Sequence, residues 1–108
     1  MNVIDLLATS LNRSDDKFNQ DLADEIIKSK RTDWVKELIE NLNCKDKNIQ
    51  SDCIKVLYEI GERGAASMIA LYFETFGNLL ESKNNRLIWG AMYALDSIAS
   101  VNPAEIFS

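Results

Sequence analysis

Residues 84 to 100 read NNRLIWGAMYALDSIAS, and their apolar side chains have the spacing of one face of an α-helix. The apolar residues fall at positions i, i+4, i+7, i+8 and i+11, which predicts one continuous stripe: Leu87, Ala91, Ala94, Leu95 and Ile98. The same spacing occurs earlier in the chain in Ile49, Cys53, Val56, Leu57 and Ile60. A less complete copy precedes that one, in Phe18, Leu22 and Ile26. Three copies of one helical pattern indicate a repeat.

The repeated unit is a pair of helices joined by a short polar turn. The alignment of the stripes also aligns the preceding helices, in the triplets Ile4, Val35, Phe73; Leu7, Leu38, Phe76; and Leu11, Leu42, Leu80. We therefore expect units at about residues 2–29, 32–61 and 64–101 of a single domain, residues 1–108. The third unit is longer by about two helical turns, which predicts a longer first helix. One pair cannot bury its apolar faces, but stacked pairs share a continuous core.

Capping and turn residues divide the chain into its helices. We expect six helices in three antiparallel pairs and no β-structure, at residues 2–12, 16–29, 32–42, 46–61, 65–82 and 84–100. Ser14 or Asp15 is the expected N-cap of the second helix, and Gly61 is the expected left-handed C-cap of the fourth. Asn102, Pro103 and Glu105 stand in the order that begins a further helix, of which residues 102–108 are the start.

The second helix of the better units follows a turn rich in Asp and Asn and has the pattern apolar-x-x-x-small-x-x-x-Leu-x-x-apolar. The pattern reads Asp46, Ile49, Cys53, Leu57, Ile60, and again Asn84, Leu87, Ala91, Leu95, Ile98. It resembles the HEAT repeat and the related armadillo-like arrays. Two features depart from that family: its frequent basic residue is replaced by Asn19, Gln50 and Ile88, and its proline in the first helix is absent. The resemblance implies an all-α, right-handed α-α superhelix of about three antiparallel helix pairs, whose second helices line a concave surface that mostly binds other proteins.

Composition narrows the class of protein. A chain of 108 residues with 46% hydrophobic residues suits one compact domain with a modest core. Its net charge of -5 disfavours nucleic acid, which is bound through clustered Lys and Arg. No apolar run approaches the length of a membrane span and no basic leader precedes Val3, so we expect no membrane span and a cytoplasmic location. Cys44 and Cys53 lack a metal-ligand spacing, and we expect both to be free thiols.

Catalytic chemistry is disfavoured because the chain contains no histidine, the usual general base near neutral pH. Adjacent carboxylates such as Asp15 with Asp16 point in different directions on a helix. No calcium loop or glycine-rich phosphate loop is present, so we expect no cofactor and no metal. The alternative is an enzyme or enzyme subunit on a HEAT-like scaffold, similar to a DNA glycosylase or a chromophore lyase. A DNA glycosylase would need a basic groove, whereas a lyase subunit would work with partner chains.

Two aromatic residues of the last helix are expected to face solvent. If the stripe faces the core, Trp89 lies about 160° and Tyr93 about 200° from its centre. Their counterparts in the earlier units are polar: Ser51 and Lys55, then Gln20 and Asp24. We expect Lys55, Tyr58, Trp89 and Tyr93 to form a site for a protein or peptide on the concave face, with Asp52 and Asp96 as its polar rim. The alternative is that the tail or a fourth repeat covers Trp89, Ile88 and Met92.

The end of the repeat array leads to a further expectation. Repeat arrays generally need a polar cap at each end, and residues 102–108 are too short to cover the third pair. Ile88, Met92 and Phe107 should therefore be partly bare. We expect either that the polypeptide is the N-terminal part of a longer repeat protein, or that two copies meet through this uncapped end as a homodimer.

Overall fold

The computed structural model describes residues 3–7, 17–99 and 101, and within these ranges it contains helices and no strand. The regular helices are α1 (Lys17–Ser29), α2 (Thr32–Glu40), α3 (Lys47–Ile60), α4 (Phe73–Leu79) and α5 (Asn85–Ile98). Shorter helical turns occupy Val3–Leu6, Asn41–Asn43, Gly61–Ala65, Ala66–Met68 and Ala70–Tyr72. The expected all-α class is therefore confirmed for the described residues. The expected caps Ser14 and Asp15 and the further helix at residues 102–108 lie outside the described residues.

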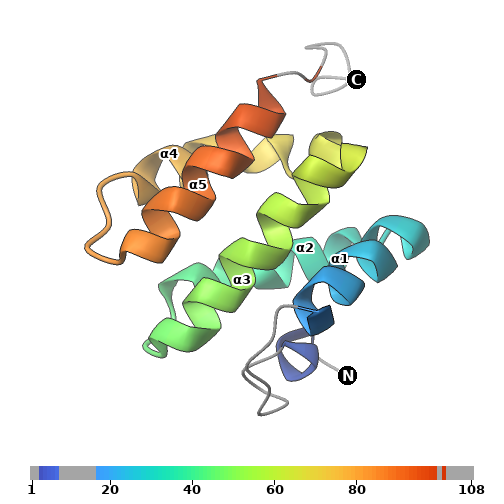
Figure 1. The fold of residues 1–108 in the computed structure, drawn as a ribbon, viewed down its shortest axis with the longest axis horizontal. Coiled ribbons are helices and arrows are strands. Elements are labelled where there is room, and N and C mark those ends of the chain that lie inside the picture. Colours follow the sequence, from blue (N-terminus) through green and yellow to red (C-terminus); the bar gives the residue numbers. More distant parts are fainter. Residues whose placement is uncertain (1–2, 8–16, 100, 102–108) are drawn as a thin grey trace.

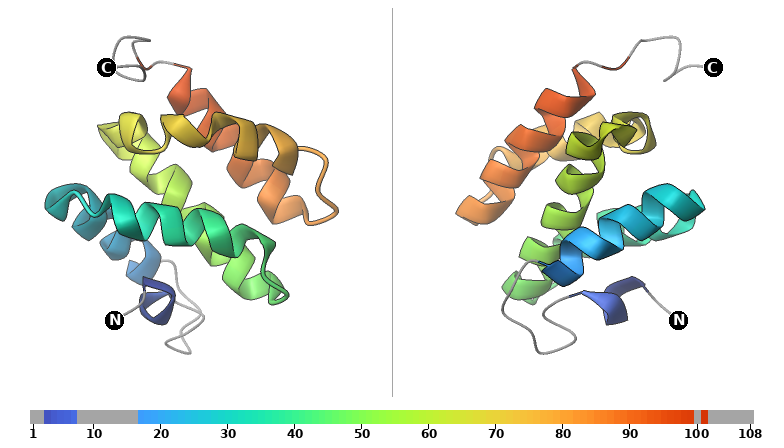
Figure 2. Two further views of the ribbon diagram at one scale, coloured as in Figure 1. Left: turned by 180° about the vertical axis from the view of Figure 1, so that it is seen from behind. Right: turned by 45° about the vertical axis from the view of Figure 1, so that its right-hand side comes forward.

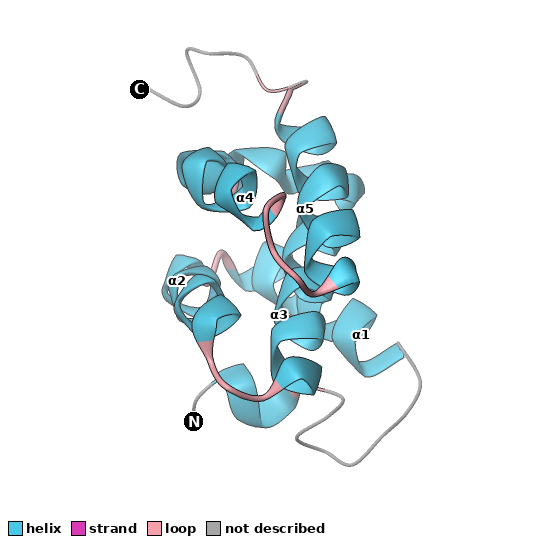
Figure 3. Cartoon of the chain, turned by 90° about the vertical axis from the view of Figure 1, so that its left-hand side faces the viewer, coloured by secondary structure: helices cyan, strands magenta, loops and turns pink. Residues whose placement is uncertain are grey.

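The helices form two layers. The front layer consists of α1, α3 and α5, which lie side by side with α3 in the middle (Figure 1). The back layer consists of Val3–Leu6, α2 and the segment from Ala66 to α4, and it lies in front when the molecule is seen from behind (Figure 2). Figure 3 shows the two layers from the side. Each front-layer helix follows a back-layer segment in sequence, so helix pairs span the layers.

The core lies between the layers. The aligned residues Leu7, Leu38 and Phe76 are all fully buried, and so are Cys53 and Ala91 at equivalent positions of α3 and α5. This burial is what the alignment of the three units predicts. Leu95 is an exception, because it is only partly buried although its counterpart Leu57 is inaccessible.

The helices α3 and α5 begin where the sequence predicts, directly after Asp46 and Asn84. The Asp46 side chain accepts hydrogen bonds from the backbone N–H groups of Asn48 at 2.8 Å and Ile49 at 3.2 Å, which fixes the start of α3. The Asn84 side chain accepts one from the N–H of Arg86 at 3.0 Å at the start of α5. These caps leave the polar turns at the layer edge and the apolar stripes between the layers.

Two expectations around the start of the third unit are wrong. Gly61 is not a left-handed cap, because its φ is −62°; the left-handed residue is Gly64, with φ of 92°. A side chain at Gly61 would instead collide with Ser97 of α5, so this glycine permits close helix packing. The single helix expected at residues 65–82 is also wrong. The extra residues of this unit form irregular turns between Gly61 and Tyr72 rather than a longer helix. The backbone leaves helical geometry at Ala65, with φ of −114° and ψ of 33°, and again at Tyr72, with φ of −100° and ψ of 21°.

The first helix differs as well. Residues 2–12 were expected to be one helix, and the described part forms a short 3₁₀ turn at Val3–Leu6. Val3 and Leu7 are fully buried, and the turn packs against both α1 and α2.

Neighbouring front-layer helices are held together by small residues and polar contacts. A side chain at Gly90 of α5 would meet Ile54 of α3, with Ile54 Cγ2 at 2.9 Å from the Cβ position. The Asn84 side-chain amide donates to Gln50 Oε1 at 3.3 Å across the same two helices. Between α1 and α3, the buried Asn19 donates to Asp52 Oδ1 at 2.9 Å. Asn19 of α1 and Gln50 of α3 therefore each take part in a hydrogen bond with the next element of the front layer.

A candidate surface on the front layer

The most exposed aromatic residues of the front layer lie on α5. Trp89 is 59% exposed and Tyr93 is 48% exposed, and they are one helical turn apart. Leu87, Ala91, Ala94 and Ile98 occupy the opposite side of the helix and are buried. The expectation that both aromatic side chains face outward is confirmed.

Tyr58 of α3 joins the exposed aromatic residues of α5. Its ring centroid lies 5.3 Å from that of Tyr93, with the ring planes inclined by 47°. Tilted aromatic pairs at this distance are favourable. The contact makes one surface of two helices, and we call the four residues Lys55, Tyr58, Trp89 and Tyr93 the front-face cluster.

Lys55 is fixed beside this aromatic pair. Its Nζ donates to Tyr58 Oη at 2.8 Å, lies 4.9 Å from the Tyr58 ring centroid and pairs with Glu59 Oε1 at 3.3 Å. Burial lowers the pKa of Lys55, but the hydrogen bonds and charges of Tyr58 and Glu59 outweigh burial, so the pKa is raised. The raised pKa keeps Lys55 charged through the neutral range. Its contribution to stability is complete below about pH 10, the ordinary lysine pKa, and is lost as pH rises through the folded value.

The ion pair of Lys55 continues across α3 to α1. Glu59 Oε2 accepts from Arg63 Nε at 3.2 Å, and Arg63 in turn pairs with Asp24 Oδ1 at 2.6 Å. Neither Glu59 nor Arg63 was expected at the site, although Lys55, Glu59 and Arg63 follow the i, i+4 spacing that produces such pairs on a helix. The network orients Lys55 and ties its helix to α1.

The two expected rim residues differ in their environment. Asp52 is partly buried and accepts the hydrogen bond from Asn19, so one of its oxygens serves the α1–α3 contact. Asp96 is exposed on α5, one turn beyond Tyr93. Asp96 is thus the rim carboxylate that solvent reaches more readily.

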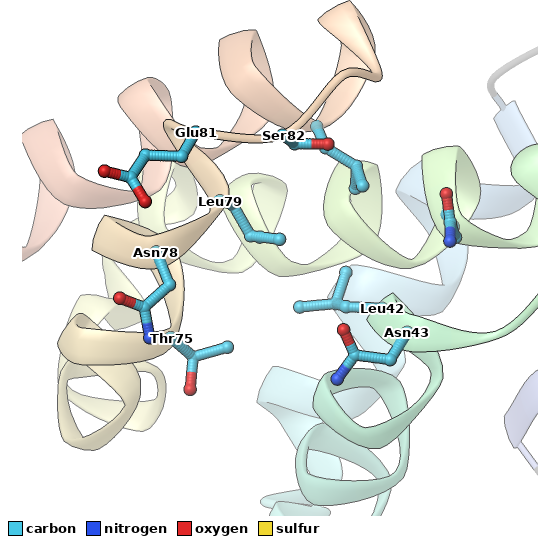
Figure 4. Close-up of a pocket in the computed structure, with 9 residues that line it drawn as sticks. Leu42, Asn43, Thr75, Asn78, Leu79, Glu81 and Ser82 are labelled. Carbon is cyan, nitrogen blue, oxygen red and sulfur yellow. The ribbon is translucent and has the colours of Figure 1, made fainter.

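The back layer contains a groove that the sequence did not indicate. It has a volume of about 440 Å³ and lies between the turn Asn41–Asn43 and the end of α4 (Figure 4). Gln50 of α3 and Leu87 of α5 also line it. Figure 4 shows Leu42 and Leu79 directed toward each other across it. The groove depends on the separation of two back-layer helices, which no sequence pattern specifies.

Two kinds of reactive group can be assessed in the described residues: metal-ligating clusters and thiols. In residues 3–7, 17–99 and 101, no group of three His, Cys, Asp or Glu side chains could hold a metal ion. Both cysteines are free, and burial raises the pKa of the Cys53 thiol, which makes it a poor nucleophile. None of the described helices has the length and apolar character needed to cross a membrane.

No protein-family model, curated protein or solved structure matches this chain. The chain's own residues therefore carry the inference about its function.

Proposed function

We propose that this protein is a protein-interaction module that binds a protein or peptide partner on the front face of a short HEAT-like α-solenoid. The observation that carries the proposal is the aromatic cluster that bridges α3 and α5, in which Trp89 and Tyr93 are about half exposed. Trp and Tyr are the residue types enriched at binding hot spots, and an exposed patch of apolar side chains is a common feature of interaction surfaces.

The front face is pre-organised for binding. The Tyr58–Tyr93 contact and the Lys55–Glu59 pair fix side chains that would otherwise lose rotamer freedom on association. Trp89 stands beside these fixed groups and supplies the largest apolar surface. The cluster therefore suits a partner that packs an apolar or aromatic anchor against the exposed faces of Trp89 and Tyr93.

Charge favours a protein partner over nucleic acid. Lys55 is neutralised by Glu59, and the rim contains the carboxylates of Asp52 and Asp96. Phosphate groups would be repelled by these carboxylates and by the net charge of -5. A peptide with basic residues beside its apolar anchor complements this surface, and the DNA glycosylase-like alternative gains no support from it.

The experiment compares proteins captured from a cell extract by the intact chain and by the variant Trp89→Ala/Tyr93→Ala. A captured protein qualifies as the partner only if its purified form binds the intact chain and the double variant weakens that binding. Each hot-spot residue should contribute at least about 2 kcal/mol, roughly a thirtyfold change in Kd. Circular dichroism and thermal melting establish that the double variant is folded.

The matched control is Gln20→Ala, because Gln20 is the counterpart of Trp89 two units earlier and lies on the same layer. It should leave binding unchanged. If the double variant binds every captured protein as tightly as the intact chain does, the front-face cluster is not the binding site. Turnover of a substrate by the purified chain alone would favour the enzymatic alternative.

A further inference from the structure

The side of the last helix pair that faces away from α3 exposes large apolar side chains. These side chains are Phe73, Leu80 and Met92, with exposed fractions of 50%, 43% and 47%. Their counterparts in the preceding unit are Val35, Leu42 and Ile54, which are at most 2% exposed. The positions stay apolar in the last pair, although no described segment covers them.

Helix geometry places the exposed positions on one side of the molecule. In α4 and just beyond it, Phe73, Gly77 and Leu80 follow the spacing i, i+4, i+7, on the side of the helix away from Thr75 and Leu79. Thr75 and Leu79 line the groove that faces α2. Phe73, Gly77 and Leu80, on the other side of the helix, therefore face away from α2.

The side of α5 that carries Ile88 and Met92 faces the same way. Ile88 and Met92 are the counterparts of Gln50 and Ile54, the α3 residues that contact the third unit through Asn84 and Gly90. On α5 the equivalent side therefore points away from α3. We call Phe73, Gly77, Leu80, Ile88 and Met92 the end face.

Gly77 gives the end face a recess between two bulky residues. A Cβ at Gly77 would meet nothing within 4 Å, so no contact of the described chain requires glycine there. Glycine inside a helix is less stable than alanine, but its lack of a side chain leaves room for the close approach of another molecule. Elsewhere in this fold a helix glycine receives a side chain of the neighbouring helix, as Gly90 receives Ile54.

We propose that the end face binds the end face of a second copy of this chain, forming a two-fold symmetric dimer. A symmetric interface must be self-complementary. The end face meets this requirement because it contains both projecting side chains, such as Phe73 and Leu80, and the Gly77 recess that receives one.

The opposite edge of the front layer argues against head-to-tail stacking. For such stacking, α1 would need to present the small residues that α5 presents to α3, Gly90 and Ser97. The counterparts on α1 are Asp21 and Lys28, which are exposed and charged. Those charged side chains would have to be buried against Met92, so the end face fits a second end face better than it fits α1.

The test is sedimentation equilibrium of the full chain across a wide range of concentration, with circular dichroism to establish folding. The apparent mass of the intact chain should rise from 12.2 kDa toward twice that value. Met92→Glu should raise the dissociation constant of the dimer at least about tenfold by placing a charge in the interface. Gly77→Leu should also raise the dissociation constant of the dimer, because the leucine fills the recess. If the chains associated only through non-specific apolar contact, the added leucine would strengthen association instead.

Thr32→Glu is the control, because it adds the same charge at an exposed position of α2 in another helix pair, and it should dimerise like the intact chain. Tyr58→Ala should also dimerise normally, which separates this proposal from the front-face one. An intact chain that stays at 12.2 kDa at every concentration would overturn the proposal. So would growth beyond two copies, or unaltered association of both end-face variants.

Discussion

Leu57 of α3 and Leu95 of α5 occupy equivalent positions but differ in burial. Leu57 is fully inaccessible, whereas Leu95 is only partly buried. Leu57→Ala should therefore lower the free energy of unfolding by about 2 to 5 kcal/mol, the range for a buried leucine, and Leu95→Ala should cost clearly less. Urea denaturation of both variants measures the difference. Equal losses would contradict the difference in burial between the two leucines.

Two helix glycines should respond oppositely to the same substitution. Gly90→Ala places a methyl group against Ile54 and should destabilise the fold by about 1 to 3 kcal/mol. Gly77→Ala meets open space and should stabilise the monomer by up to about 1 kcal/mol through helix propensity. Thermal unfolding at a concentration where the chain is monomeric gives both values. Adding Ile54→Ala to Gly90→Ala should recover part of the packing strain, and its failure to do so would contradict the assigned contact.

The two cysteines provide a probe of burial that needs no substitution. Cys53 is buried and its thiol pKa is raised, so it should resist alkylation in the native protein. Cys44 is partly exposed and should react first. Because a raised folded pKa favours the protonated thiol, Cys53 contributes to stability most fully below its unfolded pKa of about 8.5, and this contribution declines as pH rises toward the folded value. Mass spectrometry after labelling with and without urea should show one modified cysteine in the native state and both in the unfolded state. Equal rates of labelling would contradict the position of α3.

The capping residue Asp46 controls the start of α3, the central element of the front layer. Asp46→Ala removes acceptors for two backbone N–H groups and should cost about 1 kcal/mol. Asp46→Asn retains an acceptor and should cost less. Denaturant unfolding of the pair tests the cap, and equal losses would indicate that the charge of Asp46, rather than its hydrogen bonds, stabilises the helix.

The sequence predicted the elements whose apolar spacing and caps agree, and it failed where local backbone geometry decides. Residues 46–61 and 84–100 have both an Asp or Asn cap and a five-residue stripe, and α3 and α5 match them closely. Residues 65–82 contain enough apolar residues for a helix, but the backbone leaves helical geometry at Ala65 and Tyr72 and the residues between them form short turns. A count of apolar positions does not predict where the backbone leaves helical geometry.

At the scale of the whole molecule, the front-face cluster could be anticipated in part. The outward direction of Trp89 and Tyr93 followed from helical angles alone, and Tyr58 was expected to extend the patch from the adjacent helix. The Glu59–Arg63–Asp24 network and the back-layer groove were missed because they depend on the distance between helices. The recess at Gly77 was missed for a similar reason, since a glycine in a helix acquires meaning only when its surroundings are known.

The front-face cluster and the end face share α5 but point in different directions. Trp89 lies about 60° around the helix from Met92, at the boundary between the two surfaces. A dimer can therefore restrict access to Trp89 while leaving Tyr58 and Lys55 open. Partner binding should weaken as the chain dimerises, and equally, a bound partner should shift the chain toward the monomer. Sedimentation of the chain with and without partner measures this coupling, and independence of the two equilibria would show that the surfaces do not overlap.

The most direct test of the central claim is an amide NMR titration of the intact chain with the partner identified by the Trp89→Ala/Tyr93→Ala comparison. The indole N–H resonance of Trp89 and the backbone amides of Lys55, Tyr58 and Tyr93 should shift most. The indole of Trp34 in α2, which lies under the guanidinium of Arg31, serves as the internal reference and should not move. Changes centred instead on the back-layer groove around Asn43 and Asn78, or on Phe73 and Leu80, would contradict the account.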